Sequence, residues 1–257
     1  RIAALEQDLQ VRLFDRIGKS IQLTEAGTKL LPKAIDMLNQ ADDIKRLASN
    51  LDSEVKGRLT LGTSHHIGLH RLPPVLKEFT RNYADVDLDI RFMDSEAACH
   101  SVEIGELEIA IVTLPHKSSD KLLTRQIWHD PLAIMVNQDH PLKQLKQVSL
   151  KTLVQYPAVI PGRGTYTREI LDAALKTNQV EPQIAMSTNY LETLKMLASI
   201  GLGWTLLPLS MLDEDLSCLK ISSLNLSRSL GVVTHRDRTL SNPALAMMEI
   251  CKSNAIQ

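Results

Sequence analysis

A long amphipathic stretch constrains the fold of this chain more than any other feature. Its apolar residues recur every three or four positions, at an average of about 3.5, which is the spacing of a coiled-coil seam. Thr24 is suited to cap such a helix, and Glu25 suits its positive end. A helix of about 30 residues extends about 45 Å and cannot bury its seam alone. We therefore expect residues 24–57 to be a linker helix that pairs with a second copy. The seam residues are Leu31, Ile35, Leu38, Ala41, Ile44, Ala48, Leu51 and Val55.

A small unit precedes this helix. Ile2, Leu5 and Leu9 have helical spacing, and a basic turn at 18–20 separates two short segments that suggest strands. Residues 1–23 therefore predict the C-terminal part of a winged helix-turn-helix. The chain begins in mid-helix with Arg1, so we expect an earlier part of the protein to be missing.

From residue 58 onward, strand and helix patterns alternate. This alternation predicts an α/β fold with a largely parallel sheet, built as two successive units. The expected strands are 58–62, 86–92, 108–113, 132–136, 157–161, 183–187, 204–208 and 230–236, and the expected helices are 72–83, 97–107, 167–177, 189–201 and 242–254.

Composition excludes several classes of protein. The 257 residues are 44% hydrophobic and carry a net charge of −1, so nothing in the overall charge attracts DNA or a membrane. No apolar run reaches about 18 residues, so we expect no membrane span and a cytoplasmic location. Cys99, Cys218 and Cys251 are far apart, which favours buried, unreactive thiols. A redox switch between two of them is the alternative.

The first 31 residues carry a dense, ordered motif. It consists of Leu5-Glu6, Leu9, Leu13-Phe14, Arg16 and the run Leu23-Thr24-Glu25-Ala26-Gly27. This run resembles the DNA-binding signature of LysR-type bacterial transcriptional regulators. Further landmarks that resemble the family are Leu72-Pro73, the 105–111 box with Glu108 where Asp is usual, His140-Pro141-Leu142 and 201–208.

The resemblance covers essentially the whole chain and implies an architecture. Residues 58–257 would form a two-lobe effector domain with the periplasmic-binding-protein-like (type 2) fold. Lobe I would comprise 58–130 and 235–257, and lobe II would comprise 131–234. The chain would cross between the lobes near 128–133 and return near 230–237.

The resemblance also implies the partners. They are double-stranded DNA, a small, anionic metabolite acting as co-inducer, and further copies of the chain in a homodimer or homotetramer. The family's base-reading residues would lie mostly in the missing N-terminal part. Arg1, Arg12, Arg16 and Lys19 are therefore predicted to contact phosphates, and ordinary solvated charge is the alternative.

Candidate effector contacts follow the strand ends. Ser64, His65 and His66 begin a helix directly after a strand, where hydroxyls and backbone N–H groups suit an anion. The alternative for Ser64 is a plain helix cap. Thr113 ends a buried strand at its carboxyl edge. In the second unit the candidates are Thr165, Tyr166 and Asn189.

The sequence offers little evidence for a metal site or for an enzymatic activity. His66 and His70 have the i, i+4 spacing of two ligands on one helix face, with His65 beside them. No carboxylate or cysteine has matching spacing, so we expect no metal and no other cofactor. GxSxG, HExxH, P-loop and GxGxxG motifs are absent, so we expect no catalytic residues. A solute-binding protein or a small-molecule enzyme on the same fold are the alternatives to a regulator.

Overall fold

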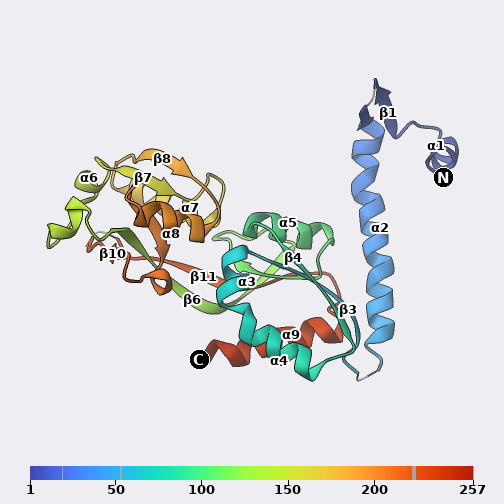
Figure 1. Ribbon diagram of the computed structural model, residues 1–257. Helices are drawn as coiled ribbons and strands as arrows, with labels where there is room; N and C mark the ends of the chain where they lie inside the picture. Colours follow the sequence, from blue (N-terminus) through green and yellow to red (C-terminus); the bar gives the residue numbers. More distant parts are fainter. Residues whose placement is uncertain (19, 53, 222–223, 257) are drawn as a thin grey trace. The chain divides into compact units, whose positions relative to one another are not determined.

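The chain folds as two units, which are described in turn (Figure 1). The computed structural model describes residues 1–18, 20–52, 54–221 and 224–256. One unit comprises Arg1–Ser53 with Arg238–Ser241, and the other comprises Glu54–Asp237 with Asn242–Gln257. Four residues that the sequence assigns to lobe I, 238–241, thus belong to the unit of the long helix.

The N-terminal unit consists of a helix, a hairpin and a long helix. These are α1 (Ile2–Leu9), the antiparallel strands β1 (Phe14–Ile17) and β2 (Ser20–Leu23), and α2 (Glu25–Ser49). The long helix ends about six residues before the point that its apolar seam predicts. Ser49, Asn50 and Asp52 explain the early end, because such side chains favour caps and turns over helix interiors.

Thr24 and Gly27 fix the start of α2. The Thr24 hydroxyl accepts a hydrogen bond from the Gly27 N–H at 3.0 Å and donates one to the Arg12 carbonyl oxygen at 2.6 Å. A Cβ atom on Gly27 would lie 2.2 Å from the carbonyl oxygen of Leu13. The close approach of helix and hairpin therefore requires glycine at this position, which gives a physical reason for the Leu-Thr-Glu-Ala-Gly run.

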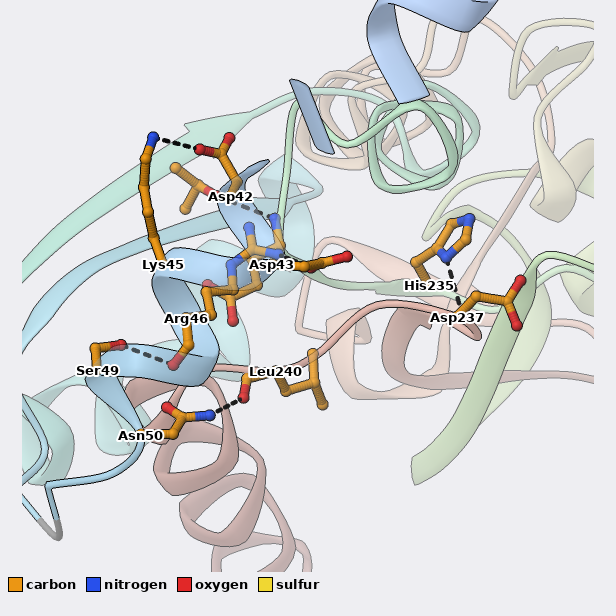
Figure 2. A network of polar contacts seen from close by, with 11 residues as sticks. Asp42, Asp43, Lys45, Arg46, Ser49, Asn50, His235, Asp237 and Leu240 are labelled. Atoms are coloured by element: carbon orange, nitrogen blue, oxygen red, sulfur yellow. Dashed lines mark hydrogen bonds and ion pairs between the residues drawn. The ribbon is translucent and has the colours of Figure 1, made fainter. Parts of the chain in front are cut away.

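The 238–241 segment lies along the end of α2. The side-chain amide of Asn50 donates a hydrogen bond to the Leu240 carbonyl oxygen at 2.9 Å (Figure 2). Burial lowers the pKa of Arg238, and the nearby Asp43 carboxylate opposes that effect. Asp43 also pairs with Arg46 at 3.2 Å. The segment is thus held to the helix by polar contacts.

Lobe I of the second unit is built on parallel strands. Strand β3 pairs in parallel with β4 on one side and with β5 on the other. This confirms the α/β prediction for the first half of the unit. The elements are β3 (Gly57–Thr63), α3 (His65–His70), α4 (Leu72–Asn82), β4 (Val86–Phe92), α5 (Ser95–Ile104), β5 (Ile109–Thr113), α9 (Asn242–Ser253) and η3 (Asn254–Ile256).

Lobe II has a core around Trp204. The Trp204 side chain is fully buried, and its indole N–H donates to the Tyr156 carbonyl oxygen at 3.1 Å. The elements are η1 (Pro141–Gln144), α6 (Leu150–Leu153), β7 (Pro157–Ile160), α7 (Tyr166–Thr177), β8 (Gln183–Ser187), α8 (Leu191–Ser199), β9 (Thr205–Pro208), η2 (Leu209–Met211) and β10 (Leu216–Cys218).

Two long antiparallel strands connect the lobes (Figure 1). They are β6 (Leu122–Asn137) and β11 (Leu226–His235). Residues 132–137 of β6 pair with strands β9 and β10 of lobe II, whereas 230–234 of β11 pair with β5 of lobe I. The return crossing therefore begins at Leu226, a few residues earlier than the sequence suggests.

One expectation about the cysteines is wrong. Cys99 and Cys251 are buried free thiols, as expected, but Cys218 is exposed. The reason is its position at the end of β10, an edge strand of the seven-stranded sheet.

Candidate ligand-binding site between the lobes

A cavity of about 310 Å³ lies between lobe I and lobe II. Six of the seven side chains that the sequence singles out as effector contacts line this cavity, although they come from four separate parts of the chain. These six are Ser64, His65, His66, Thr113, Thr165 and Asn189.

Tyr166 is the exception among the predicted contacts. Its side chain packs against the lobe I core that contains Cys99, and burial raises the pKa of its hydroxyl. Its backbone N–H donates to Glu96 at 2.5 Å. Sequence patterns place Tyr166 at the start of a helix but do not give the direction of its side chain, which explains the difference.

The hydroxyls of Ser64 and Thr165 differ in their availability. Ser64 occupies the N-cap position of α3, yet its side chain makes no capping hydrogen bond. Thr165 caps α7 by accepting from the Arg168 N–H at 3.2 Å, and its hydroxyl donates to the Gly162 carbonyl oxygen at 2.9 Å. Ser64 is therefore the hydroxyl better placed to serve a ligand.

Arg228 also lines the cavity, although it is not among the predicted effector contacts. It is only 5% exposed. Its Nε donates to Asp130 at 2.8 Å and its Nη1 donates to Thr167 at 3.0 Å, while Nη2 is buried without a hydrogen-bond partner among the described residues. Burial lowers the pKa of Arg228, and Asp130 opposes this effect. An arginine side chain nevertheless stays charged at neutral pH.

Two carboxylates of lobe I line the same cavity and bond to lobe II. Asp94 accepts a hydrogen bond from the side-chain amide of Asn189 at 2.7 Å, and Glu96 accepts from the backbone of Tyr166. Burial raises the pKa of Glu96. The cavity thus combines one buried cation with two hydrogen-bonding acids.

A third contact between the lobes joins α3 to α8. The Oε1 atom of Glu192 lies 3.2 Å from Nδ1 of His66 and 3.1 Å from Nε2 of His70. Burial, together with the charge of Arg228, lowers the pKa of His66 to about 4, so this ring is neutral at pH 7. Burial acts to raise the pKa of Glu192, but hydrogen bonds from its own backbone and from His66 outweigh it and leave the pKa lowered.

The predicted phosphate contacts lie in the N-terminal unit. Arg1, Arg12 and Arg16 are exposed, around α1 and in β1. Lys19 lies outside the described residues. Exposure is what phosphate contact requires, and the role of these side chains stays a prediction.

Comparison with known families decides the classification. Residues 52–255 match the LysR substrate binding domain, and residues 1–28 match the bacterial regulatory helix-turn-helix protein of the lysR family. The chain belongs to the LysR family of transcriptional regulators. This result confirms the family that the motif run at 1–31 suggests.

Relatives of this LysR-type chain are regulators themselves. It is 26% identical over 257 residues to the uncharacterized HTH-type transcriptional regulator YwqM of Bacillus subtilis, covering 98% of this chain and 87% of that protein. It is 27% identical over 252 residues to YeiE, a protein with the same description from Escherichia coli K12, covering 96% and 84%. No helix among the described residues is long and apolar enough to cross a membrane.

Solved structures share the fold. The cofactor-binding domain of the Cbl regulator matches with a TM-score of 0.70 at 22% identity, covering 77% of this chain and 89% of that one. The effector-binding domain of QuiR in complex with shikimate matches with a TM-score of 0.70 at 16% identity, covering 79% and 98%. A full-length OxyR variant from Pseudomonas aeruginosa matches with a TM-score of 0.72 at 21% identity, covering 99% and 83%. The predicted architecture of partial winged helix-turn-helix, linker helix and two-lobe domain is thereby confirmed.

Proposed function

We propose that this LysR-type regulator senses a small organic anion bound in the cavity between its lobes. The observation that carries the proposal is the buried guanidinium of Arg228, which lines the cavity and keeps Nη2 without a hydrogen-bond partner among the described residues. A buried donor left unsatisfied costs about 1–3 kcal/mol, and more in a charged group. A carboxylate or phosphate bound beside Arg228 would supply the missing acceptor once a small side-chain shift opens Nη2 to the cavity.

Size and surrounding groups narrow the ligand further. A cavity of about 310 Å³ is at the small end of the range for metabolite sites. The carboxylates of Asp94 and Glu96 line the same cavity as Arg228 and can accept hydrogen bonds. A ligand with an acidic group for Arg228 and hydroxyl or amino groups for these two carboxylates would therefore fit. The QuiR effector-binding domain holds shikimate, and the Synechocystis CcmR regulatory domain, a solved structure of the same fold, holds 2-PG. Both ligands support a small effector for this chain.

The effect of the bound effector on DNA binding would be transmitted through the N-terminal unit. Leu38 and Ile44 on α2 are 68% and 67% exposed, which leaves an apolar face suited to the same helix of a second copy. We infer a cytoplasmic homodimer or homotetramer that spaces two DNA-binding heads. Arg1, Arg12, Arg16 and Lys19 would contact phosphates of double-stranded DNA.

The effector proposal is tested by thermal melting of the chain with a panel of hydroxy acids, amino acids and phosphorylated acids. A ligand at 100 times its Kd stabilises the fold by about 2.7 kcal/mol. For a domain of roughly 200 residues, that is a rise in Tm of about 5–10 °C.

Ser64→Ala and Thr113→Val should reduce the rise, because both side chains line the cavity. Ser217→Ala, on β10 away from the cavity lining, is the control variant. The proposal is wrong if only uncharged analogues raise Tm, or if the Ser64 and Thr113 variants respond as strongly as the unmodified chain.

A further inference from the structure

His66, His70 and Glu192 bring three metal-binding atoms together at the contact between the lobes. The two histidines lie on one face of α3, and their ring centroids are 4.6 Å apart. Glu192 comes from α8 in lobe II. One ligand atom from each residue lies within 4.8 Å of the other two.

The distances suit a small divalent ion. Zinc binds imidazole nitrogen and carboxylate oxygen at about 2.0–2.2 Å, which places neighbouring ligand atoms of a tetrahedral site about 3.3–3.5 Å apart. The Oε1 atom of Glu192 lies 3.2 Å and 3.1 Å from the two histidine nitrogens. Both distances from Glu192 are therefore close to those of a tetrahedral site, and the three ligand atoms lie within 4.8 Å of one another.

The surroundings of the cluster also suit an ion. The second carboxylate oxygen of Glu192, Oε2, is buried and has no hydrogen-bond partner among the described residues. The positive charge of Arg228 is offset by Asp130 at 2.8 Å, which limits its repulsion of a cation.

We propose that His66, His70 and Glu192 bind a divalent transition-metal ion of the zinc class, which ties α3 of lobe I to α8 of lobe II. Two imidazoles and one carboxylate are a known donor set for zinc and leave a fourth position for water or another ligand. The site depends neither on the identity of the effector nor on DNA binding. His66 belongs to both sites, so the ion would sit at the wall of the effector cavity.

Residue spacing alone points away from this site. His66 and His70 provide two ligands at helical spacing, but no carboxylate follows at a matching distance in the sequence. Folding supplies the third ligand from 122 positions further along the chain. The prediction that the chain holds no metal considered local spacing only, and the geometry of α3 and α8 argues against it.

The test is a zinc titration of the full chain after a chelator has removed bound metal, with a chromophoric zinc chelator as competitor. A Cys218→Ser background removes the exposed thiol as an accidental ligand. We expect one zinc ion per chain and a higher Tm with zinc than without it. His70→Ala and Glu192→Gln should each weaken binding by at least about tenfold.

His65→Ala is the matched control, because His65 neighbours the cluster but contacts Phe92 and Tyr190 instead. It should bind zinc as the unmodified chain does. The His70 side chain is 49% exposed, so its loss should not unfold the domain. If zinc fails to bind with one-to-one stoichiometry, or binds equally well to the His70 and Glu192 variants, the three side chains form only a hydrogen-bonded contact and the proposal is overturned.

Discussion

Replacing Arg228 with methionine should destabilise the effector domain strongly. Arg228 and Asp130 form a 2.8 Å ion pair whose side chains are 4% and 2% exposed. The substitution leaves the Asp130 carboxylate buried, with only Arg71 at 3.4 Å to offset its charge. It also removes the donor to the Thr167 hydroxyl.

The size of the effect follows from the burial of the pair. Breaking a buried ion pair by removing one partner costs about 3–5 kcal/mol, because the charge that remains is poorly compensated. For a domain of roughly 200 residues, this corresponds to a fall in Tm of about 6–20 °C. Thermal melting followed by circular dichroism, with urea unfolding as a second measurement, gives both values.

A double variant tests the reason for the loss. Arg228→Met combined with Asp130→Val removes both charges, and replacing a whole buried pair with apolar side chains is often neutral or stabilising. We expect the double variant to recover most of the lost stability without recovering the response to anions. A double variant as unstable as Arg228→Met alone would refute the argument, because uncompensated charge could not then be the cause.

Three further predictions concern other parts of the chain. Gly27→Ala places a Cβ atom 2.2 Å from the Leu13 carbonyl oxygen, so we expect the N-terminal unit to lose about 1–3 kcal/mol of stability. Urea unfolding followed by circular dichroism measures this loss, and an unchanged unfolding curve would contradict the prediction. Nδ1 of His140 accepts from the Leu142 N–H at 3.2 Å, and burial lowers its pKa below the unfolded value of about 6.5, so this stability is present above that pH and lost below it. Between about pH 7 and pH 5, Tm should therefore fall less in His140→Asn, whose amide caps at any pH, and an equal fall would count against the cap. Ile44→Glu puts a charge on the exposed face of α2 and should dissociate the oligomer in analytical ultracentrifugation, and an unchanged mass would locate the interface elsewhere.

Periodicity in the sequence predicts most of the elements that position the site. The strands at 86–92 and 183–187 have the bounds that their patterns indicate, because large apolar side chains occupy alternate positions along each of them. The sequence does not predict the first half of β6, because residues there show no strand pattern. Thr124, Arg125 and Gln126 lie in a strand that spans the gap between two lobes, and there a strand needs no apolar face.

The ligand cavity is predictable in part. Hydroxyls at strand ends and helix starts indicate Ser64, Thr113 and Thr165, because the topology of the fold brings such ends together. Arg228 also leaves a signal. It alternates with Leu226 and Leu230, so it occupies the apolar face of its strand, where a charge is rare unless it is paired.

Contacts between residues far apart in the sequence cannot be predicted from sequence patterns in this way. Nothing near His66 indicates Glu192, and nothing near Asp94 indicates Asn189, because both contacts join lobes that are far apart in the sequence. They depend on how the two lobes close on each other. A single sequence carries no pattern that reports this closure.

The 238–241 segment has a practical consequence for experiments on this regulator. The chain passes between its two units three times, at 53–54, 237–238 and 241–242. Leu240, the hydrogen-bond partner of Asn50, follows the last residue of β11 by five positions. A protein truncated near residue 54 to isolate the sensor would keep Leu240 but lose Asn50. Such a fragment would keep the cavity between the lobes but lose the hydrogen bond that ties Leu240 to the end of α2.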